Sequence, residues 1–285
     1  MSTSKQDTLM QERIQRKMDS LTTRSRCSLC WFASNVCICQ QIQPLPFTLN
    51  VHFATYLHET EWLNAADDAK LLCLAAPDRT TMLVHGRLGD DAKLQHLVQN
   101  AKNSCLLFPD DDAITVADFQ ATTDTTTTST TTLALETTYN TTIDLLIIVV
   151  DATWRRARKM AKYLERNVIG DVKHIKLETD TVSVYSRTQT EPGRICTIEA
   201  VSLLLQEMGE QDGVCRALID YVKINNQALR PKKKSHLYET GRGKFHPAWY
   251  FHMELVPEKR ERPTADDAGA DVDQVKKRPK TLKGK

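Results

Sequence analysis

Apolar positions between residues 47 and 229 follow two alternating patterns. Short apolar runs predict strands at 47–57, 81–86, 104–109, 144–150 and 172–177. Segments with apolar residues at helical spacing predict helices at 67–76, 90–101, 154–167, 196–210 and 213–229. Strands that alternate with helices predict an α/β fold with a mostly parallel sheet and helices on both faces.

Polar segments interrupt and flank this pattern. Residues 1–26 are charged, and we interpret them as a flexible N-terminal arm or a short, weak helix. Threonine dominates residues 118–142, a polar tract with too little apolar area to offset its ordering entropy. We therefore predict a flexible insertion in a surface loop at 111–142. Residues 257–285 are predicted to be a disordered basic tail. The remainder divides into a cysteine module at 27–40 and a larger domain at 41–256.

Charge and hydropathy indicate where in the cell the protein is located. The net charge of the 285 residues is only +2, but cations gather at 230–234 and in the last ten residues, KKRPKTLKGK. That end is a nuclear import signal, an extra arm that grips RNA or a solvated terminus. No apolar run reaches about 18 residues, and the N-terminus lacks the apolar core of a signal peptide. We therefore predict no membrane span and a location in the cytoplasm, the nucleus or both.

Four of the eight cysteines lie in the segment CSLCWFASNVCIC, at Cys27, Cys30, Cys37 and Cys39. Because thiols stay reduced in the cytosol and nucleus, this spacing predicts a metal site rather than disulfides. Four thiolates can close a tetrahedral zinc site without an open position for water, so the zinc would be structural. The alternative is a surface loop of free thiols. The other cysteines are predicted to pack in the core: Cys73, Cys105, Cys196 and Cys215.

The segment DLLIIVVDATWRRARKM ends an aliphatic strand at Asp151 and opens a helix at Trp154. Ligands of open parallel sheets bind beyond the carboxyl ends of the strands, so Asp151 is a candidate site residue. The alternative is that Asp151 or Thr153 caps the helix. Trp154 heads an apolar stripe, which is typical of a core anchor.

The opposite side of this helix carries six cations, Arg155, Arg156, Arg158, Lys159, Lys162 and Arg166. Charge runs usually form solvated faces. The first five of these cations lie within eight residues that include no acid, and such a cationic surface also fits a phosphate-rich partner.

Three blocks together resemble the DTW-domain family, named for an Asp-x-Thr-Trp motif. They are VHGRLGDD…CLLFPD, the segment LLIIVVDATWRRARKM with Asp151, Thr153 and Trp154, and VYSRTQTEPGRICTIEA. The resemblance covers about residues 27–230, includes the cysteine cluster and is interrupted by the threonine tract. It implies a fold related to the SPOUT methyltransferases, with a C-terminal trefoil knot.

The activity that the resemblance implies is that of a tRNA-uridine aminocarboxypropyltransferase. Such an enzyme transfers the 3-amino-3-carboxypropyl (acp) group of S-adenosylmethionine to N3 of a uridine in tRNA. Uridine N3 is mostly protonated at neutral pH, so the reaction needs a base, a role that Asp151 suits. The sulfonium activates three carbons, and positioning selects the one that reacts.

The resemblance also implies roles for further residues. Cofactor contacts are expected from Leu107, Pro109, Thr153, Trp154, Thr197 and Glu199. RNA contacts are expected from Arg155, Arg156, Arg158, Lys159 and Arg187. Tyr185 lies in the same matched block as Arg187. Glu199 has an alternative interpretation as a first-turn acid favoured by the helix dipole.

One segment departs from the family. Where members often carry His-Pro-x-Glu followed by an arginine and Asn-Thr, this chain keeps His58 and Glu61 but has Asn64, Asp67 and Asp68. Two acids there would weaken binding of phosphate or cofactor, so substrate choice and activity stay open. The alternatives are an RNA-binding or ribosome-assembly protein with a decayed site, or acp transfer to ribosomal RNA. The oligomeric state, monomer or homodimer, also stays open.

Overall fold

A computed structural model of the chain describes residues 5–124, 143–179, 183–185 and 194–229. Its centre is a five-stranded sheet with the order β2-β1-β4-β3-β5, in which every pairing is parallel. The strands are Val51–Leu57 (β1), Thr80–Val84 (β2), Ala101–Leu107 (β3), Ile143–Asp151 (β4) and Lys173–Ile175 (β5). Each overlaps a predicted strand, and the predicted parallel sheet is confirmed.

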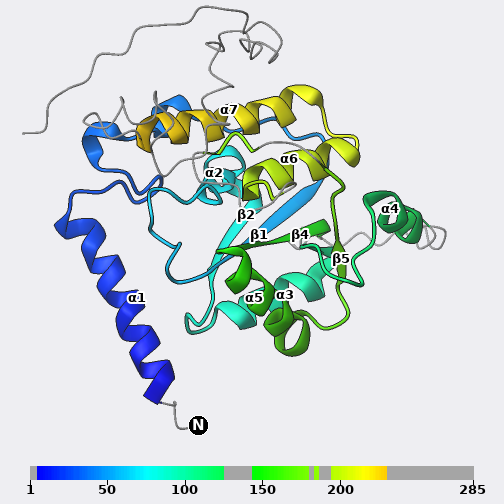
Figure 1. Cartoon of the computed structure of the whole chain (residues 1–285), viewed down its shortest axis with the longest axis horizontal. Coiled ribbons are helices and arrows are strands. Elements are labelled where there is room, and N and C mark those ends of the chain that lie inside the picture. The colour runs from blue at the N-terminus through cyan, green and yellow to red at the C-terminus, as the bar shows by residue number, and fades with distance from the viewer. Residues whose placement is uncertain (1–4, 125–142, 180–182, 186–193, 230–285) are drawn as a thin grey trace, which may run out of the picture.

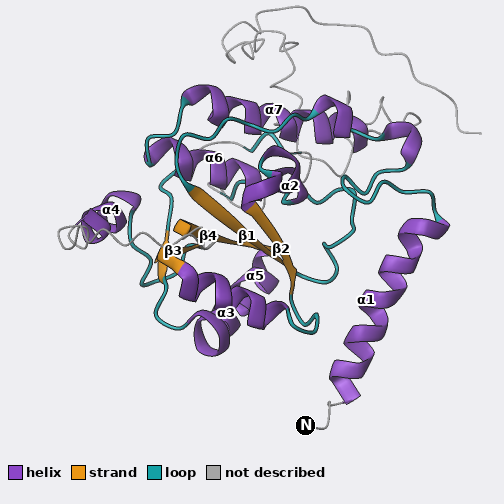
Figure 2. Ribbon diagram, turned by 180° about the vertical axis from the view of Figure 1, so that it is seen from behind, coloured by secondary structure: helices purple, strands orange, loops and turns teal. Residues whose placement is uncertain are grey.

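Helices cover both faces of this sheet. The helices among the described residues are α1 (Lys5–Thr23), α2 (Lys70–Ala75), α3 (Asp90–Asn100), α4 (Val116–Asp124), α5 (Trp154–Leu164), α6 (Thr197–Glu207) and α7 (Asp212–Leu229). Helices α2, α6 and α7 lie on one side of the sheet and α3 and α5 on the other (Figures 1 and 2). Short 3-10 turns occur at Ser34–Val36, Cys39–Gln41 and Pro77–Arg79, and a π-helical turn, Glu165–Ile169, extends α5.

The alternation of side chains along buried strands supplies two cores. Phe53 and Ile147 point to the core shared with α2, α6 and α7. Their neighbours Ala54 and Ile148 point to the core shared with α3 and α5. Because successive side chains of a strand face opposite sides, a strand covered on both faces is apolar without interruption.

The N-terminal segment differs from its prediction as a flexible arm or a short helix. Helix α1 has 19 residues. It packs through Ile14, which is 5% exposed and shares a cluster with Trp31 and Trp62. The amine of Lys17 donates hydrogen bonds to the backbone carbonyls of Thr60 and Trp62, at 3.1 and 2.8 Å. These contacts dock the helix against the loop after β1.

The predicted flexible insertion at 111–142 is wrong for its first part. Residues 116–124 form α4, in which Val116 and Phe119 are buried. Ile114 bridges to Ile175 beside β5. The apolar residues ahead of the threonines therefore bind this segment to the sheet edge. The threonine tract at 125–142 and the tail at 257–285 lie outside the described residues.

Residues 180–182 and 186–193 lie outside the described part, and the trefoil knot stays a prediction. Within the described part, none of the helices combines the length and apolarity needed to cross a membrane.

Candidate functional site

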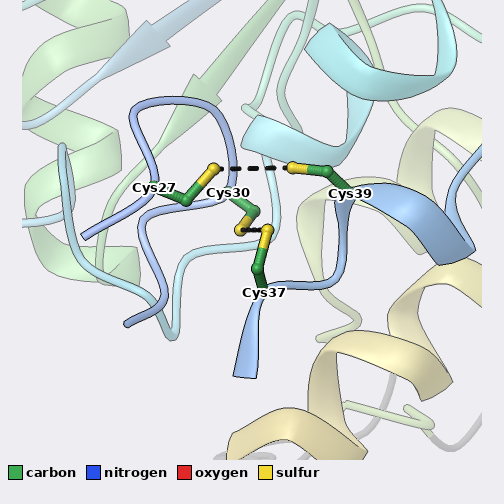
Figure 3. Close-up of side chains that lie close together, drawn as sticks. All are labelled: Cys27, Cys30, Cys37 and Cys39. Carbon is green, nitrogen blue, oxygen red and sulfur yellow. Dashed lines mark hydrogen bonds between the residues drawn. The ribbon is translucent and has the colours of Figure 1, made fainter. Parts of the chain in front are cut away.

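The four clustered cysteines come together in space. The sulfur atoms of Cys27, Cys30, Cys37 and Cys39 all lie within 4.8 Å of one another (Figure 3). The Sγ atoms of Cys27 and Cys39 are 3.6 Å apart, and those of Cys30 and Cys37 are 3.5 Å apart. Zn–S bonds of about 2.3 Å in a tetrahedron separate the sulfurs by about 3.8 Å, so the cluster fits zinc.

Local hydrogen bonds shape the loop that presents the first pair of thiols. The backbone N–H of Cys27 donates to the carbonyl of Phe32 at 2.8 Å, and that of Trp31 donates to Cys27 at 2.9 Å. Trp31 follows Cys30 with a φ of 63°, a left-handed conformation that costs a non-glycine residue about 1 kcal/mol or more. Burial of its indole, which is 2% exposed, opposes that cost.

A cavity of about 460 Å³ opens beyond the carboxyl ends of β3, β4 and β5. Its apolar wall includes Leu107, Phe108, Pro109, Val149, Ile175 and Leu177. Its polar wall includes Asp68, Asp151, Thr153, Ser183, Tyr185, Arg194 and Thr197. The edge of the sheet that the sequence indicated therefore carries a ligand-sized space.

Asp151 stands at the end of β4 with 6% of its surface exposed and lines this cavity. Its backbone carbonyl accepts a hydrogen bond from His58 N–H at 2.9 Å, which continues the β1–β4 ladder past the strands. Thr153 occupies the N-cap position of α5, and no side-chain cap bond forms there. Asp151 therefore lies in the cavity wall, and Thr153 rather than Asp151 occupies the N-cap position.

The two acids of the departing segment are buried next to the cavity. Asp68 lines it and accepts a hydrogen bond from Ile198 N–H, at 2.9 Å, in the first turn of α6. Burial, with Asp151 and Asp68 nearby, raises the pKa of Asp67. The segment therefore belongs to the site rather than to a distant surface patch.

Lys70 joins this segment to the cysteine module. Its amine has no exposed surface and donates hydrogen bonds to the carbonyl of Ala65, at 2.7 Å, and to Oδ1 of Asn225, at 2.9 Å. It also lies over the rings of Trp31 and Phe32, at 5.6 and 5.1 Å from their centroids. Burial lowers the pKa of Lys70 to about 8, against the opposing fields of the neighbouring acids.

Trp154 forms part of the cavity wall with two side chains to which the sequence assigned no role. Its ring lies 6.1 Å from that of Phe108, and the Arg194 guanidinium carbon lies 5.1 Å from the Trp154 centroid. Both residues stand in the matched blocks CLLFPD and GRICTIEA, which was the available signal. Trp154 is half-buried, so it anchors α5 and also faces the cavity.

Glu199 accepts hydrogen bonds from neighbouring segments of the chain. Its Oε2 accepts hydrogen bonds from Ser183 Oγ, at 2.5 Å, and from Cys196 N–H, at 2.7 Å, and its Oε1 accepts one from Val184 N–H at 2.5 Å. Glu199 does not line the cavity beside Asp151, unlike its neighbour Thr197. The first-turn interpretation of Glu199 therefore fits better than cofactor contact. Cys196, predicted only as a core residue, also reaches the cavity wall.

The cationic side of α5 faces away from the sheet. Arg155, Arg158, Lys159, Lys162 and Arg166 are exposed, and Arg156 is half-buried. Arg156 donates a hydrogen bond from Nη1 to Thr60 Oγ1 at 2.8 Å. Arg155 also lines the cavity, so the cationic side begins at its mouth. Arg187 lies outside the described residues.

The fold and this site define an α/β protein with a ligand cavity at the carboxyl edge of a parallel sheet and a separate four-cysteine module. The family model described as DTW domain matches residues 24–229, and the chain belongs to this family. Membership is consistent with a tRNA-modifying role. No curated protein and no solved structure gives a significant match.

Proposed function

We propose that the protein transfers the acp group of S-adenosylmethionine to N3 of a uridine in tRNA. The observation that carries the proposal is the position of Asp151 in the wall of a 460 Å³ cavity at the carboxyl end of β4, inside the matched family segment. A carboxylate there can accept the N3 proton as the new N–C bond forms and the C–S bond breaks.

The walls suit the parts of S-adenosylmethionine. Leu107, Phe108 and Pro109 offer an apolar surface for an adenine ring. Arg194 and the first turn of α6 offer positive potential for the amino-acid carboxylate. The carboxylates of Asp68 and Asp151 suit its ammonium and sulfonium groups.

Zinc, when bound to the cysteine module, would hold the 27–39 loop and supply no reactive position, because four thiolates fill a tetrahedral shell. The described residues themselves would then bind and orient the substrates. The basic side of α5, which starts at the cavity mouth, supports tRNA as the partner.

Two incubations test the proposal with unmodified tRNA. Cofactor labelled in its carboxyl group should transfer label to the RNA, and cofactor labelled in its methyl group should not. Methyl transfer would overturn the acp assignment. Binding of tRNA without any cofactor binding would instead support the RNA-binding alternative.

The role of Asp151 is tested by Asp151→Asn, which should lower the transfer rate by about 10²–10⁴-fold. The thermal unfolding midpoint should stay close to that of the unchanged protein, because asparagine keeps the size of the side chain and Thr153, rather than Asp151, occupies the N-cap position. Asp171→Asn, at an exposed position, is the matched control. Equal loss of folding stability in Asp151→Asn would favour a structural role.

A further inference from the structure

A second cluster of polar side chains lies on the side of the sheet covered by α3 and α5, at the carboxyl ends of β1 and β2. Asp91 accepts hydrogen bonds on both oxygens, from Tyr56 Oη and from Tyr163 Oη, each at 2.6 Å. Tyr56 Oη is also 3.0 Å from Nδ1 of His85. None of these side chains lines the cavity beside Asp151.

The hydrogen bonds fix the tautomer of His85. A tyrosine hydroxyl has one proton, and Tyr56 uses it to donate a hydrogen bond to the Asp91 carboxylate. Tyr56 must therefore accept the bond that it shares with His85, so the imidazole carries its proton on Nδ1. Burial lowers the pKa of His85, although Asp91 and Glu59 oppose that shift, which favours the neutral ring.

The other nitrogen, Nε2, then carries a lone pair. Among the described residues, none makes a hydrogen bond to it, and it is not one of the buried polar atoms without a partner. It therefore keeps some exposed surface. The centroid of the His85 ring lies 6.4 Å from that of His58 and 4.9 Å from that of Tyr163. His85 presents an oriented acceptor, with no proton to donate at that position.

The backbone holds this acceptor rigidly. His85 N–H donates to the carbonyl of Leu57 at 2.8 Å, which continues the β1–β2 ladder by one residue. The chain then turns at Gly86, with a φ of 78°, and Gln11 of α1 donates to the Gly86 carbonyl at 2.6 Å. Such preorganisation reduces the entropy lost on binding.

Arg156 of α5 lies near His58, whose ring stands beside that of His85. Burial lowers the pKa of His58, Glu59 opposes that shift, and the charge of Arg156 lowers the pKa further. Lys159 is exposed one turn further along the helix. Phosphates pair with such cations but offer no donor. The ribose 2′-hydroxyl is the donor that every ribonucleotide places next to a phosphate.

We propose that Nε2 of His85 accepts a hydrogen bond from a ribose 2′-hydroxyl of bound RNA, next to a phosphate held by Arg156. The proposal rests on the RNA partner of the proposed function and adds a contact that distinguishes RNA from DNA. Tyr56 and Asp91 act through His85 as positioning residues.

Interference mapping tests this contact without knowledge of the target uridine. A pool of tRNA transcripts carrying random 2′-deoxy substitutions is separated into bound and unbound fractions. The unchanged protein should disfavour one or a few substituted positions by about three- to tenfold, as expected for one hydrogen bond. Because the selection is for binding, it gives this pattern even if no acp group is transferred.

Two substitutions separate the nitrogens of His85. His85→Asn keeps a donor near Nδ1 and lacks the Nε2 acceptor, so interference at one position should disappear. His85→Gln places an amide oxygen near Nε2 and should retain part of it. An unchanged pattern in a folded His85→Asn protein would overturn the proposal.

The tautomer has its own measurement. Nitrogen-15 NMR of the free protein should show His85 protonated on Nδ1, and Tyr56→Phe should abolish that preference. A spectrum that shows the His85 proton on Nε2 in the unchanged protein would also contradict the proposal.

Discussion

The cysteine module and the cavity take their residues from the chain in opposite ways. The module collects its four thiols from thirteen consecutive residues, whereas the cavity wall draws on segments between Asp68 and Ala200. A local site is visible in residue spacing, because the spacing itself limits which thiols can meet. A site of distant segments exists only after the sheet has aligned its strand ends. Lys70 nevertheless connects the two regions, because it contacts aromatic rings of the module and interacts with the acids beside the cavity.

The largest effect is expected when the local site is broken. Cys30→Ser removes the one buried thiolate of the cluster, and the module should lose zinc together with several kcal/mol of folding free energy. For a chain of this size, that loss corresponds to a fall of the unfolding midpoint by about 10 °C or more. Calorimetry and metal analysis would measure both. Cys73→Ser, outside the cluster, is the control and should retain its zinc.

The next effect tests the connection between the two regions. Lys70→Met leaves the Ala65 carbonyl and Asn225 without their buried cation, which should cost about 3 kcal/mol in chemical denaturation. Asp67→Asn in the same chain should recover part of this loss, since it removes the acid whose charge acts most strongly on the amine. Strictly additive losses in the double variant would show that the acid and the amine are not coupled.

A smaller effect is expected at the mouth of the cavity. Replacement of Arg155, Arg156 and Lys159 by alanine should weaken tRNA binding about ten- to thirtyfold and flatten its dependence on salt, as lost phosphate contacts do. Alanine at three exposed lysines elsewhere, Lys93, Lys102 and Lys223, is the matched control. A salt slope equal to that of the unchanged protein would remove α5 from the RNA interface.

The smallest effect concerns the cavity wall alone. Arg194→Ala should weaken S-adenosylmethionine about five- to tenfold by calorimetric titration, because a charged hydrogen-bond donor is lost. The unfolding midpoint should hardly move. Arg166→Ala, on the exposed side of the π-helical turn, should leave the affinity unchanged. Equal affinities in both variants would contradict a cofactor contact by Arg194.

The sequence predicted what depends on periodicity and spacing. The parallel sheet and the helix after Asp151 follow from runs and stripes of apolar residues. The cysteine cluster follows from spacing, and the structure brings all four thiols together. The family resemblance, rather than periodicity, singled out Leu107, Pro109, Thr153, Trp154 and Thr197 as cofactor contacts, and all five line the cavity.

What the sequence missed depends on contacts between distant segments. Helix α4 stands where the threonine tract suggested a loop, because Val116 and Phe119 find a buried surface beside β5. Asp68 and Arg194 line the same cavity only after the chain has folded. Glu199 resembles a ligand-binding residue of the motif, yet it binds Ser183 and Val184. The spacing of residues in the sequence cannot predict where that segment runs.

The buried amine of Lys70 limits how this architecture can be rearranged. A cysteine module grafted from another protein would bring new aromatic rings to a position where Asn225 and the Ala65 carbonyl already hold a cation. Grafting would succeed only if the incoming loop tolerated that charge beneath it. The module and helices α2 and α7 are therefore expected to be inherited as one unit rather than exchanged piecewise.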